Sequence, residues 1–231
     1  MTSRCAIMRR MKLSSRLIGK SLRLRRRARP ASLAVMAPFP DIYLVRHGET
    51  QWNLEKRFQG MRDSPLTATG RAQASTVARI LARELGDGHR TALQTSPLPR
   101  AVETAAIIHG TLAGLPPAPV PALRELHLGL WEGLRRAEIK AGWPALLAGV
   151  PKAEWYFAAP GGEGYDAALA RVEAWLHGLT GPVVAVSHSV TGRLIRGLYA
   201  GLPRPATLAL PAPQDSVWHL GRHGMVELGE A

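Results

Sequence analysis

The stretch "DIYLVRHGET", residues 41–50, decides the fold. A continuous apolar run from Ile42 to Val45 is followed directly by Arg46 and His47. Short uninterrupted apolar runs are typical of strands that are buried on both faces of a parallel sheet. In such sheets, ligands bind beyond the carboxyl ends of the strands. The stretch therefore predicts a buried strand that delivers a cation and an imidazole to a binding site.

Strands and helices are expected to alternate along the rest of the chain. Further buried strands are predicted in "TALQTS" (91–96) and "PVVAVSHS" (182–189). Helices are predicted in "TATGRAQASTVARILAREL" (67–85), "PRAVETAAIIHG" (99–110), "GYDAALARVEAWLHGL" (164–179) and "TGRLIRGLYAG" (191–201). A last strand pair is expected in 215–228, with "GRHG" as its turn. This order predicts an α/β domain, a three-layer α/β/α sandwich with a largely parallel central sheet.

Charge divides the chain into two parts. Of the 30 Lys and Arg residues, 11 fall in residues 1–40, which contain no Asp or Glu. The other 191 residues hold 19 basic residues against 17 acidic ones. The high net charge of +13 therefore belongs to the start of the chain. We expect a basic, disordered leader in residues 1–36 and one folded domain in residues 37–231.

Three interpretations of the leader stay open. Met36 can be the true start of the protein, because it stands shortly before the first strand. The leader also has the Arg-rich, acid-free composition of an import presequence, which would direct an otherwise cytoplasmic protein to an organelle. Alternatively, it is a basic arm that contacts nucleic acid or an anionic membrane surface.

Cysteine content and hydropathy narrow the class further. The one cysteine, Cys5, excludes an intramolecular disulfide and a thiolate metal site. No apolar run approaches the roughly 20 residues of a membrane-spanning helix. These features fit a cytoplasmic protein, and the sequence leaves open whether it is a homodimer.

The ends of three predicted strands carry polar side chains that can bind an anion. Arg46 and His47 follow the first strand, Ser96 ends the second with Arg100 four residues later, and His188 ends the third. Two guanidiniums and two imidazoles at one edge of a sheet form a site for a dianion, most commonly phosphate. Backbone N–H groups at the start of the helix after His188 would add to the cradle.

His47 is the candidate nucleophile. No phosphate-binding loop, serine-hydrolase elbow or zinc-protease motif occurs in the sequence. A neutral imidazole can attack phosphorus and divide one difficult displacement into two easier ones. The charges of neighbouring arginines would keep the ring unprotonated beside a phosphate.

Six blocks of sequence carry a resemblance to a known family. They are "LVRHGET" with Asn53, "RFQGMRDSPLTATGRAQA" (57–74), "TSPLPRAVETA" (95–105), "LRELHLGLWEG" (123–133), "PGGEG" (160–164) and "VSHSVTGRLI" (186–195). In this order, the chain resembles the histidine phosphatase superfamily, the phosphoglycerate-mutase-like proteins, from residue 41 to about residue 200. The resemblance implies a phosphoryl-transfer enzyme that acts on a small phosphorylated metabolite and needs no metal and no cofactor.

The resemblance also implies roles for particular residues. His47 is expected to carry the phosphoryl group, and Glu125 to protonate the leaving oxygen and later to activate water. The remaining site residues are expected to be Arg46, Arg100 and His188 in the phosphate pocket, with Asn53, Thr50, Gln59, Gly60 and Ser189 in substrate binding. In the alternative, purely structural interpretation, His188 is a hydrogen-bonded histidine of the core and Glu125 is a charged residue on a helix surface. The other histidines and the tryptophans are interpreted as structural.

Three functions remain in competition. Ser189 replaces a glycine that often follows the second histidine, and "GEG" (162–164) replaces "GES", so the substrate stays open. The segment between Trp131 and Glu163 is short and lacks the paired arginines followed by a Pro-rich run with which the cofactor-dependent mutases close over a substrate carboxylate. A metal-independent phosphatase is therefore favoured over a phosphoglycerate mutase. A non-catalytic phospho-ligand-binding module is the minor alternative, since every catalytic group is present.

Overall fold

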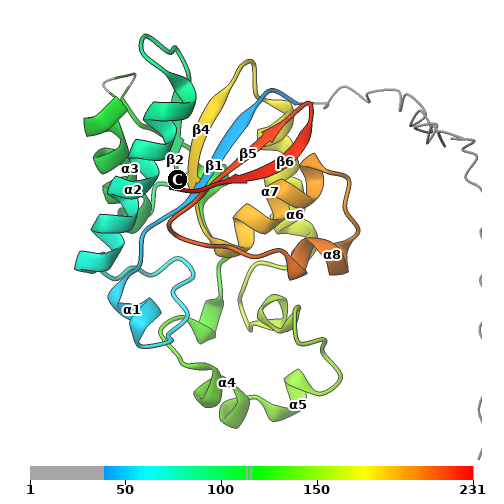
Figure 1. Cartoon of the computed structure of the whole chain (residues 1–231). Coiled ribbons are helices and arrows are strands. Elements are labelled where there is room, and N and C mark those ends of the chain that lie inside the picture. Colours follow the sequence, from blue (N-terminus) through cyan, green and yellow to red (C-terminus); the bar gives the residue numbers. More distant parts are fainter. Residues whose placement is uncertain (1–38, 113, 115, 231) are drawn as a thin grey trace, which may run out of the picture. The chain divides into compact units, whose positions relative to one another are not determined.

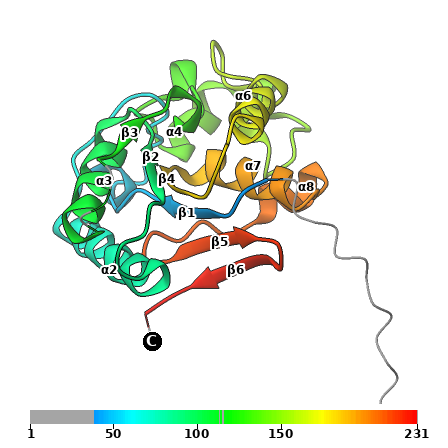
Figure 2. The ribbon, with the colours of Figure 1, turned by 90° about the horizontal axis from the view of Figure 1, so that it is seen from above.

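The computed structural model describes residues 39–112, 114 and 116–230, so the predictions for the leader lie outside the described residues. Six strands form one sheet, with helices on both of its faces (Figures 1 and 2). The strands are β1 (Ile42–Arg46), β2 (Ala92–Thr95), β3 (Ala118–Pro119), β4 (Val183–Ser187), β5 (Val217–Gly221) and β6 (Gly224–Leu228). The predicted three-layer α/β/α architecture is confirmed.

The sheet is largely parallel, as predicted. Its order is β3-β2-β4-β1-β5-β6, and β1, β2, β3 and β4 pair in parallel. The hairpin of β5 and β6 adds to the free edge of β1 in antiparallel orientation. Gly221 pairs with Gly224 across its turn, which confirms the expected turn at "GRHG".

The two central strands bury both of their faces. Ile42 and Leu44 of β1 pack into one apolar cluster, whereas Val45 packs into a second. Along β4, Val183 and Ala185 likewise face the first cluster, and Val184 and Val186 face the second. This alternation explains why both sequences are continuous apolar runs and do not alternate with polar residues.

Helices cover each face of the sheet. One face is covered by α2 (Ala68–Leu85) and α3 (Pro99–Leu112), and the other by α6 (Tyr165–His177) and α7 (Ser189–Tyr199), with α8 (Arg204–Ala209) beside them (Figure 2). Each of the first four coincides with a predicted helix to within a few residues. No helix of the described residues is both long and apolar enough to cross a membrane.

Helix α2 shows how the sequence sets an element's bounds. The side chain of Thr67 accepts a hydrogen bond from the backbone N–H of Gly70 at 2.9 Å and so caps the first turn. Gly86 ends the helix with a φ of +68°, a conformation that favours glycine. The small residues Ala74 and Ala78 lie in the buried stripe, which lets α2 approach α3 closely.

The segment between β3 and α6 forms a lobe beyond the carboxyl edge of the sheet (Figure 1). It contains α4 (Arg136–Gly142), α5 (Pro144–Leu147) and the short 3-10 helices η1 (Pro121–Leu123), η2 (Gly129–Trp131) and η3 (Trp155–Ala158). Trp131 and Trp155 are buried and stack with ring centroids 5.4 Å apart. Both pack in the apolar cluster that also contains Ile42 and Leu44 of β1, as their interpretation as packing residues expected, so the core on this face of the sheet continues into the largely irregular segment.

The start of α2 presses against the loop that follows β1. A Cβ atom added at Gly70 would overlap the backbone carbonyl oxygen of Glu49, and one at Gly48 would overlap the carbonyl of Gly70. Backbone cannot move aside as a flexible side chain can. Two glycines are therefore required where the loop carrying His47 crosses the helix.

We predict that Gly70→Ala lowers the free energy of unfolding by about 1–3 kcal/mol, the usual range for overpacking. Gly110→Ala is the matched control, because Gly110 also lies in a helix and an added Cβ would meet no described atom within 4 Å. The control should be neutral or stabilising by up to about 1 kcal/mol. Urea denaturation of both variants measures the difference, and equal stability of the two would contradict the close approach.

Candidate active site

The register of the sheet brings the predicted strand ends together. Arg46 pairs with Ser187, so the next residues, His47 and His188, leave β1 and β4 side by side. The backbone N–H of His47 donates to the carbonyl of Ser187 at 3.0 Å, and the two imidazole centroids are 5.0 Å apart. Two histidines separated by 141 positions in the sequence thus meet at one edge of the sheet.

His47 is held as a neutral imidazole. It is buried, and its Nδ1 lies 2.8 Å from the carbonyl oxygen of Gly48. An acceptor at this distance requires the proton on Nδ1, which leaves the lone pair on Nε2. Burial lowers the pKa of His47 well below its usual value, and the charges of Arg100 and Arg46 lower it further. His47 therefore offers an unprotonated nitrogen at neutral pH.

His188 is also buried and neutral. Its Nε2 lies 2.7 Å from the hydroxyl oxygen of Ser96, at the end of β2, and its Nδ1 has no hydrogen-bond partner within the described part of the chain. Burial lowers the pKa of His188 well below its usual value, followed by the charge of Arg100 and the proximity of His47. Its surroundings are polar and cationic, which argues against the core-histidine interpretation.

Two arginines accompany the histidines. Arg100 is 1% exposed and donates to the carbonyls of Arg62 and Gly60, each at 2.8 Å, and to the carboxylate of Asp63 at 2.9 Å. Arg46 is half-buried and donates to the carbonyl of Ala212 at 2.6 Å. Burial lowers the pKa of Arg46 to about 10, so it stays charged at neutral pH. In each guanidinium the buried Nε has no partner among the described residues.

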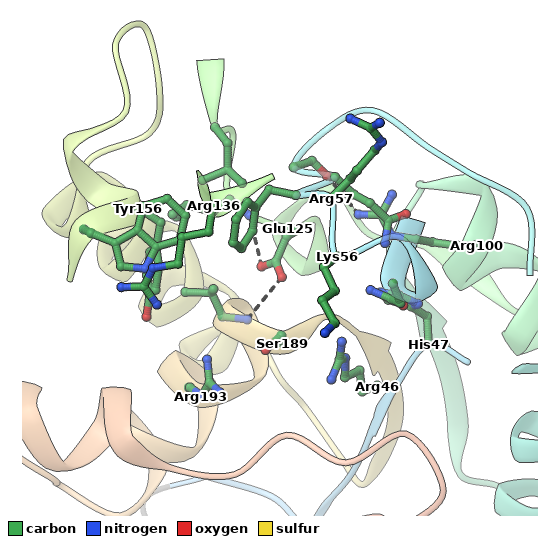
Figure 3. Close-up of a pocket in the computed structure, with 18 residues that line it drawn as sticks. Arg46, His47, Lys56, Arg57, Arg100, Glu125, Arg136, Tyr156, Ser189 and Arg193 are labelled. Carbon is green, nitrogen blue, oxygen red and sulfur yellow. Dashed lines mark hydrogen bonds between the residues drawn. The ribbon is translucent and has the colours of Figure 1, made fainter. Parts of the chain in front are cut away.

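Glu125 lies in an irregular segment between η1 and η2, not on a helix surface. Its carboxylate accepts hydrogen bonds from the backbone N–H groups of Val190 and Thr191, both at 3.1 Å, at the start of α7. The N-terminus of a helix favours a carboxylate through its exposed N–H groups and its dipole. The alternative of an ordinary helix charge is wrong, and Glu125 faces the same space as His47 (Figure 3).

Glu163 braces the segment that carries Glu125. Its carboxylate accepts from Arg171 of α6 at 2.8 Å and from Arg124 at 3.1 Å, and it is almost buried. Arg171 also donates to the carbonyls of Ala122 and Arg124. The substituted "GEG" motif is thus linked to the backbone next to Glu125 and does not line the cavity.

The residues expected to bind substrate divide into two groups. Asn53, Gln59, Gly60 and Ser189 line the cavity. Thr50 is fully buried behind them: it caps the short helix α1 (Gln51–Leu54) and accepts from the side chain of Gln59 at 2.8 Å. His188 is not among the lining residues, although its ring centroid lies only 5.0 Å from that of His47. The geometry therefore gives Thr50 a supporting position beneath the cavity wall.

A segment near the C-terminus, residues 210–214, forms hydrogen bonds to several residues of the site. The carbonyls of Leu210, Pro211 and Ala212 accept hydrogen bonds from Arg193, Arg196 and Arg46 respectively. Two residues later, the side-chain nitrogen of Gln214 donates to the carbonyl of His47 at 3.0 Å and to the side-chain oxygen of Asn53 at 3.2 Å. No sequence pattern indicated this segment, because most of its contacts to the site are made by backbone carbonyls.

The side chains surround a cavity of about 340 Å³ (Figure 3). Part of its lining was not predicted from the sequence, namely Lys56, Arg57, Phe58, Leu126, Leu128, Arg136, Trp155, Tyr156, Val190 and Arg193. The position of Arg193 could have been predicted, because it lies four residues after Ser189 and therefore on the same face of the helix. Arg136 and Tyr156 reach the cavity from α4 and η3, and no local pattern indicated this.

Comparison with known proteins places this site in a family. The chain matches the model of the histidine phosphatase superfamily (branch 1) over residues 42–226. It is 37% identical over 177 residues to the probable phosphoglycerate mutase GpmB of Photorhabdus laumondii. That alignment covers 72% of this chain and 77% of the relative. It is 50% identical over 92 residues to GpmB of Escherichia fergusonii, but the match spans only 40% of each protein. The chain therefore belongs to the histidine phosphatase superfamily.

Solved structures agree with this assignment. Bacillus stearothermophilus YhfR superposes with a TM-score of 0.67 at 31% identity, covering 81% of this chain and 94% of that one. The alpha-ribazole phosphatase from Shigella flexneri has a TM-score of 0.69 at 26% identity, covering 82% and 96%. The mycobacterial glucosyl-3-phosphoglycerate phosphatase in complex with VO3 has a TM-score of 0.65 at 30% identity, covering 79% and 92%. The chain is thus an enzyme of this superfamily, as its resemblance predicted.

The lowered pKa values of His47 and His188 predict a pH dependence of stability. In the unfolded chain both rings titrate near 6.5, whereas in the folded chain they stay neutral below that pH. The unfolded state therefore binds more protons, and the free energy of unfolding falls as the pH drops below 6.5. Each ring contributes a slope of up to about 1.4 kcal/mol per pH unit.

Urea denaturation between pH 7.5 and 5.5 measures this slope. We expect His47→Gln and His188→Gln each to give a shallower dependence than the unsubstituted protein. His223→Gln, in the exposed hairpin turn, is the control and should retain the full slope. An unchanged slope in both active-site variants would show that the rings are protonated in the folded protein.

Proposed function

We propose that the enzyme is a metal-independent phosphatase that hydrolyses a small phosphomonoester through a phosphohistidine at His47. One observation carries this proposal: Arg46, Arg100 and His188 each leave a buried nitrogen without a hydrogen-bond partner among the described residues, around a neutral His47. Buried polar groups are normally hydrogen-bonded. A phosphate dianion beside Nε2 of His47 would supply acceptors for these nitrogens.

The first half of the reaction transfers the phosphoryl group. Nε2 of His47 attacks phosphorus, the N–P bond forms and the bond from phosphorus to the ester oxygen breaks. Glu125 in its acid form gives its proton to the leaving oxygen, so an alcohol departs. Arg46 and Arg100 stabilise the charge that spreads over the other phosphoryl oxygens. Fixed guanidiniums in a buried site suffice for this role, so no step of the proposed reaction uses a metal ion.

The second half returns the enzyme to its starting state. Glu125, now a carboxylate, takes a proton from water while the water oxygen attacks phosphorus. The N–P bond breaks, the electron pair returns to Nε2 of His47, and inorganic phosphate leaves. Glu125 is held for both steps by the backbone N–H groups of α7 and by the segment that Glu163 and Arg171 brace. Asn53, Gln59, Gly60 and Ser189 are proposed to contact the substrate along the cavity wall.

A phosphoglycerate mutase is the second candidate, because the GpmB relatives carry that name. A mutase must keep water from the phosphohistidine until a substrate hydroxyl takes the phosphoryl group. The segment between Trp131 and Glu163, which forms part of the lobe, is short. Two of the solved structures compared above are phosphatases by name. These features favour hydrolysis.

A cytoplasmic location is part of the same proposal.

The deciding experiment measures phosphate release from a panel of phosphomonoesters, with EDTA present throughout. Formation of 2-phosphoglycerate from 3-phosphoglycerate is followed in parallel. We expect release with EDTA present, and an acid-labile, base-stable phosphoenzyme after rapid quenching. His47→Ala should lose both signals, with a rate at least 10³-fold lower, because the nucleophile is gone. Isomerisation without release would establish the mutase, and loss of activity in EDTA would refute the metal-free reaction.

Glu125→Gln tests the acid and base roles separately. Alkyl phosphates should be hydrolysed about 10²–10⁴-fold more slowly, the usual contribution of a positioned acid or base. With p-nitrophenyl phosphate the leaving group needs no proton, so the first half-reaction should persist. We expect a burst of about one equivalent of p-nitrophenol and accumulation of the phosphoenzyme. Equal loss for both substrates without a burst would mean that Glu125 only supports the structure.

A further inference from the structure

The cavity carries more positive charge than one phosphate requires. Its lining contains six basic side chains and one carboxylate, that of Glu125. The six are Arg46, Lys56, Arg57, Arg100, Arg136 and Arg193. Burying like charges beside one another is unfavourable unless a ligand or a carboxylate compensates them. The imbalance therefore indicates which further groups the substrate presents.

Three of the six charges have an assigned counter-charge. Arg57 pairs with Glu55 at 2.8 Å, and Figure 3 shows its guanidinium directed away from the centre of the cavity. Arg100 pairs with Asp63, and Arg46 lies next to His47, where the reacting phosphate is proposed to bind. Lys56, Arg136 and Arg193 form no ion pair with any carboxylate of the described residues. Lys56 is exposed and lies on the His47 side.

Arg136 and Arg193 converge on the opposite side of the cavity, together with Tyr156 (Figure 3). They come from α4, α7 and η3, so three separate elements present polar groups to one place. The guanidinium of Arg136 lies 5.4 Å from the ring centroid of Trp155, which fixes its direction without using its N–H donors. Nε of Arg193 donates to the carbonyl of Leu210 at 2.6 Å, which holds its guanidinium in the lining of the cavity beside Tyr156.

Tyr156 adds a neutral donor between the two arginines. Burial raises the pKa of its hydroxyl, and the nearby charge of Arg193 only partly opposes this, so the phenol keeps its proton at neutral pH. The wall of the cavity also contains apolar side chains, among them Phe58, Leu128 and Trp155. The cavity thus has a reacting cationic pocket at His47, an apolar wall and a second group of donors at its far side.

We propose that Arg136, Tyr156 and Arg193 form a second-anion subsite, so that the substrate is a small phosphomonoester bearing a second anionic group, a carboxylate or another phosphate. The planar guanidinium groups match either group with paired N–H donors. The inference rests on the proposed phosphatase function and specifies its substrate. It also accounts for a cavity of about 340 Å³, which suits a small metabolite.

Matched pairs of substrates test the subsite. 3-Phosphoglycerate and glycerol 3-phosphate differ by a carboxylate in place of a hydroxymethyl group, and fructose 1,6-bisphosphate and fructose 6-phosphate differ by one phosphate. The readout is the ratio of kcat/KM within each pair. We expect a ratio of at least tenfold in favour of the doubly anionic member in one pair, which identifies the second group. Because each ratio is taken within one preparation, partial unfolding of a variant cancels.

Substitutions then assign the preference to the subsite. Arg136→Gln and Arg193→Gln should each bring the ratio toward one, and Arg193→Lys should retain part of it because the charge remains. Lys140→Gln is the matched control: Lys140 is exposed on the same helix as Arg136, four residues on, and should leave the ratio unchanged. An unchanged ratio in both glutamine variants would overturn the subsite.

The possible failures are distinguishable. Phosphate release with a phosphoenzyme but equal rates within both pairs would refute the second-anion subsite and retain the phosphatase. Absence of both release and phosphoenzyme with every ester would refute the phosphatase and, with it, the subsite.

Discussion

The structure depends on two neutral imidazoles buried beside guanidinium groups at the ends of adjacent parallel strands. Burial and positive charge both oppose protonation of His47 and His188, so the arrangement is self-consistent only while the rings stay neutral. The parallel register of β1 and β4 makes the two rings neighbours. A dianion that enters this space would meet two guanidinium groups and an unprotonated His47.

Much of the remaining structure keeps these charges in place. The carbonyls of residues 210–212 accept from Arg193, Arg196 and Arg46, and Gln214 fixes the backbone of His47. On the opposite side, Glu163 and Arg171 hold the segment of Glu125. Preorganised donors need not reorient when charge develops in a reaction. The enzyme therefore uses irregular segments, which carry little regular hydrogen bonding of their own, as supports for its reacting groups.

The proposed reacting centre and the proposed second-anion subsite have different structural origins. The ends of strands buried on both faces supply His47, Ser96 and His188, and they cannot shift without disturbing the core. The lobe between β3 and α6 supplies Arg136 and Tyr156, and its stacked Trp131 and Trp155 continue the apolar cluster that covers one face of the sheet. The two histidines of the proposed reacting centre thus come from the ends of the strands, whereas two of the three residues of the proposed second-anion subsite come from the lobe.

The sequence by itself determined the main strands, four helices and the meeting of Arg46, His47, Arg100 and His188, because local apolar periodicity and parallel pairing fix where strand ends lie. Only the tertiary structure placed Glu125 at the start of α7, Thr50 beneath the cavity wall, and Arg136 and Tyr156 across from His47. These positions depend on long-range contacts of irregular segments. A loop has no repeating pattern, so its course is set by the carbonyls, side chains and packing surfaces that it meets.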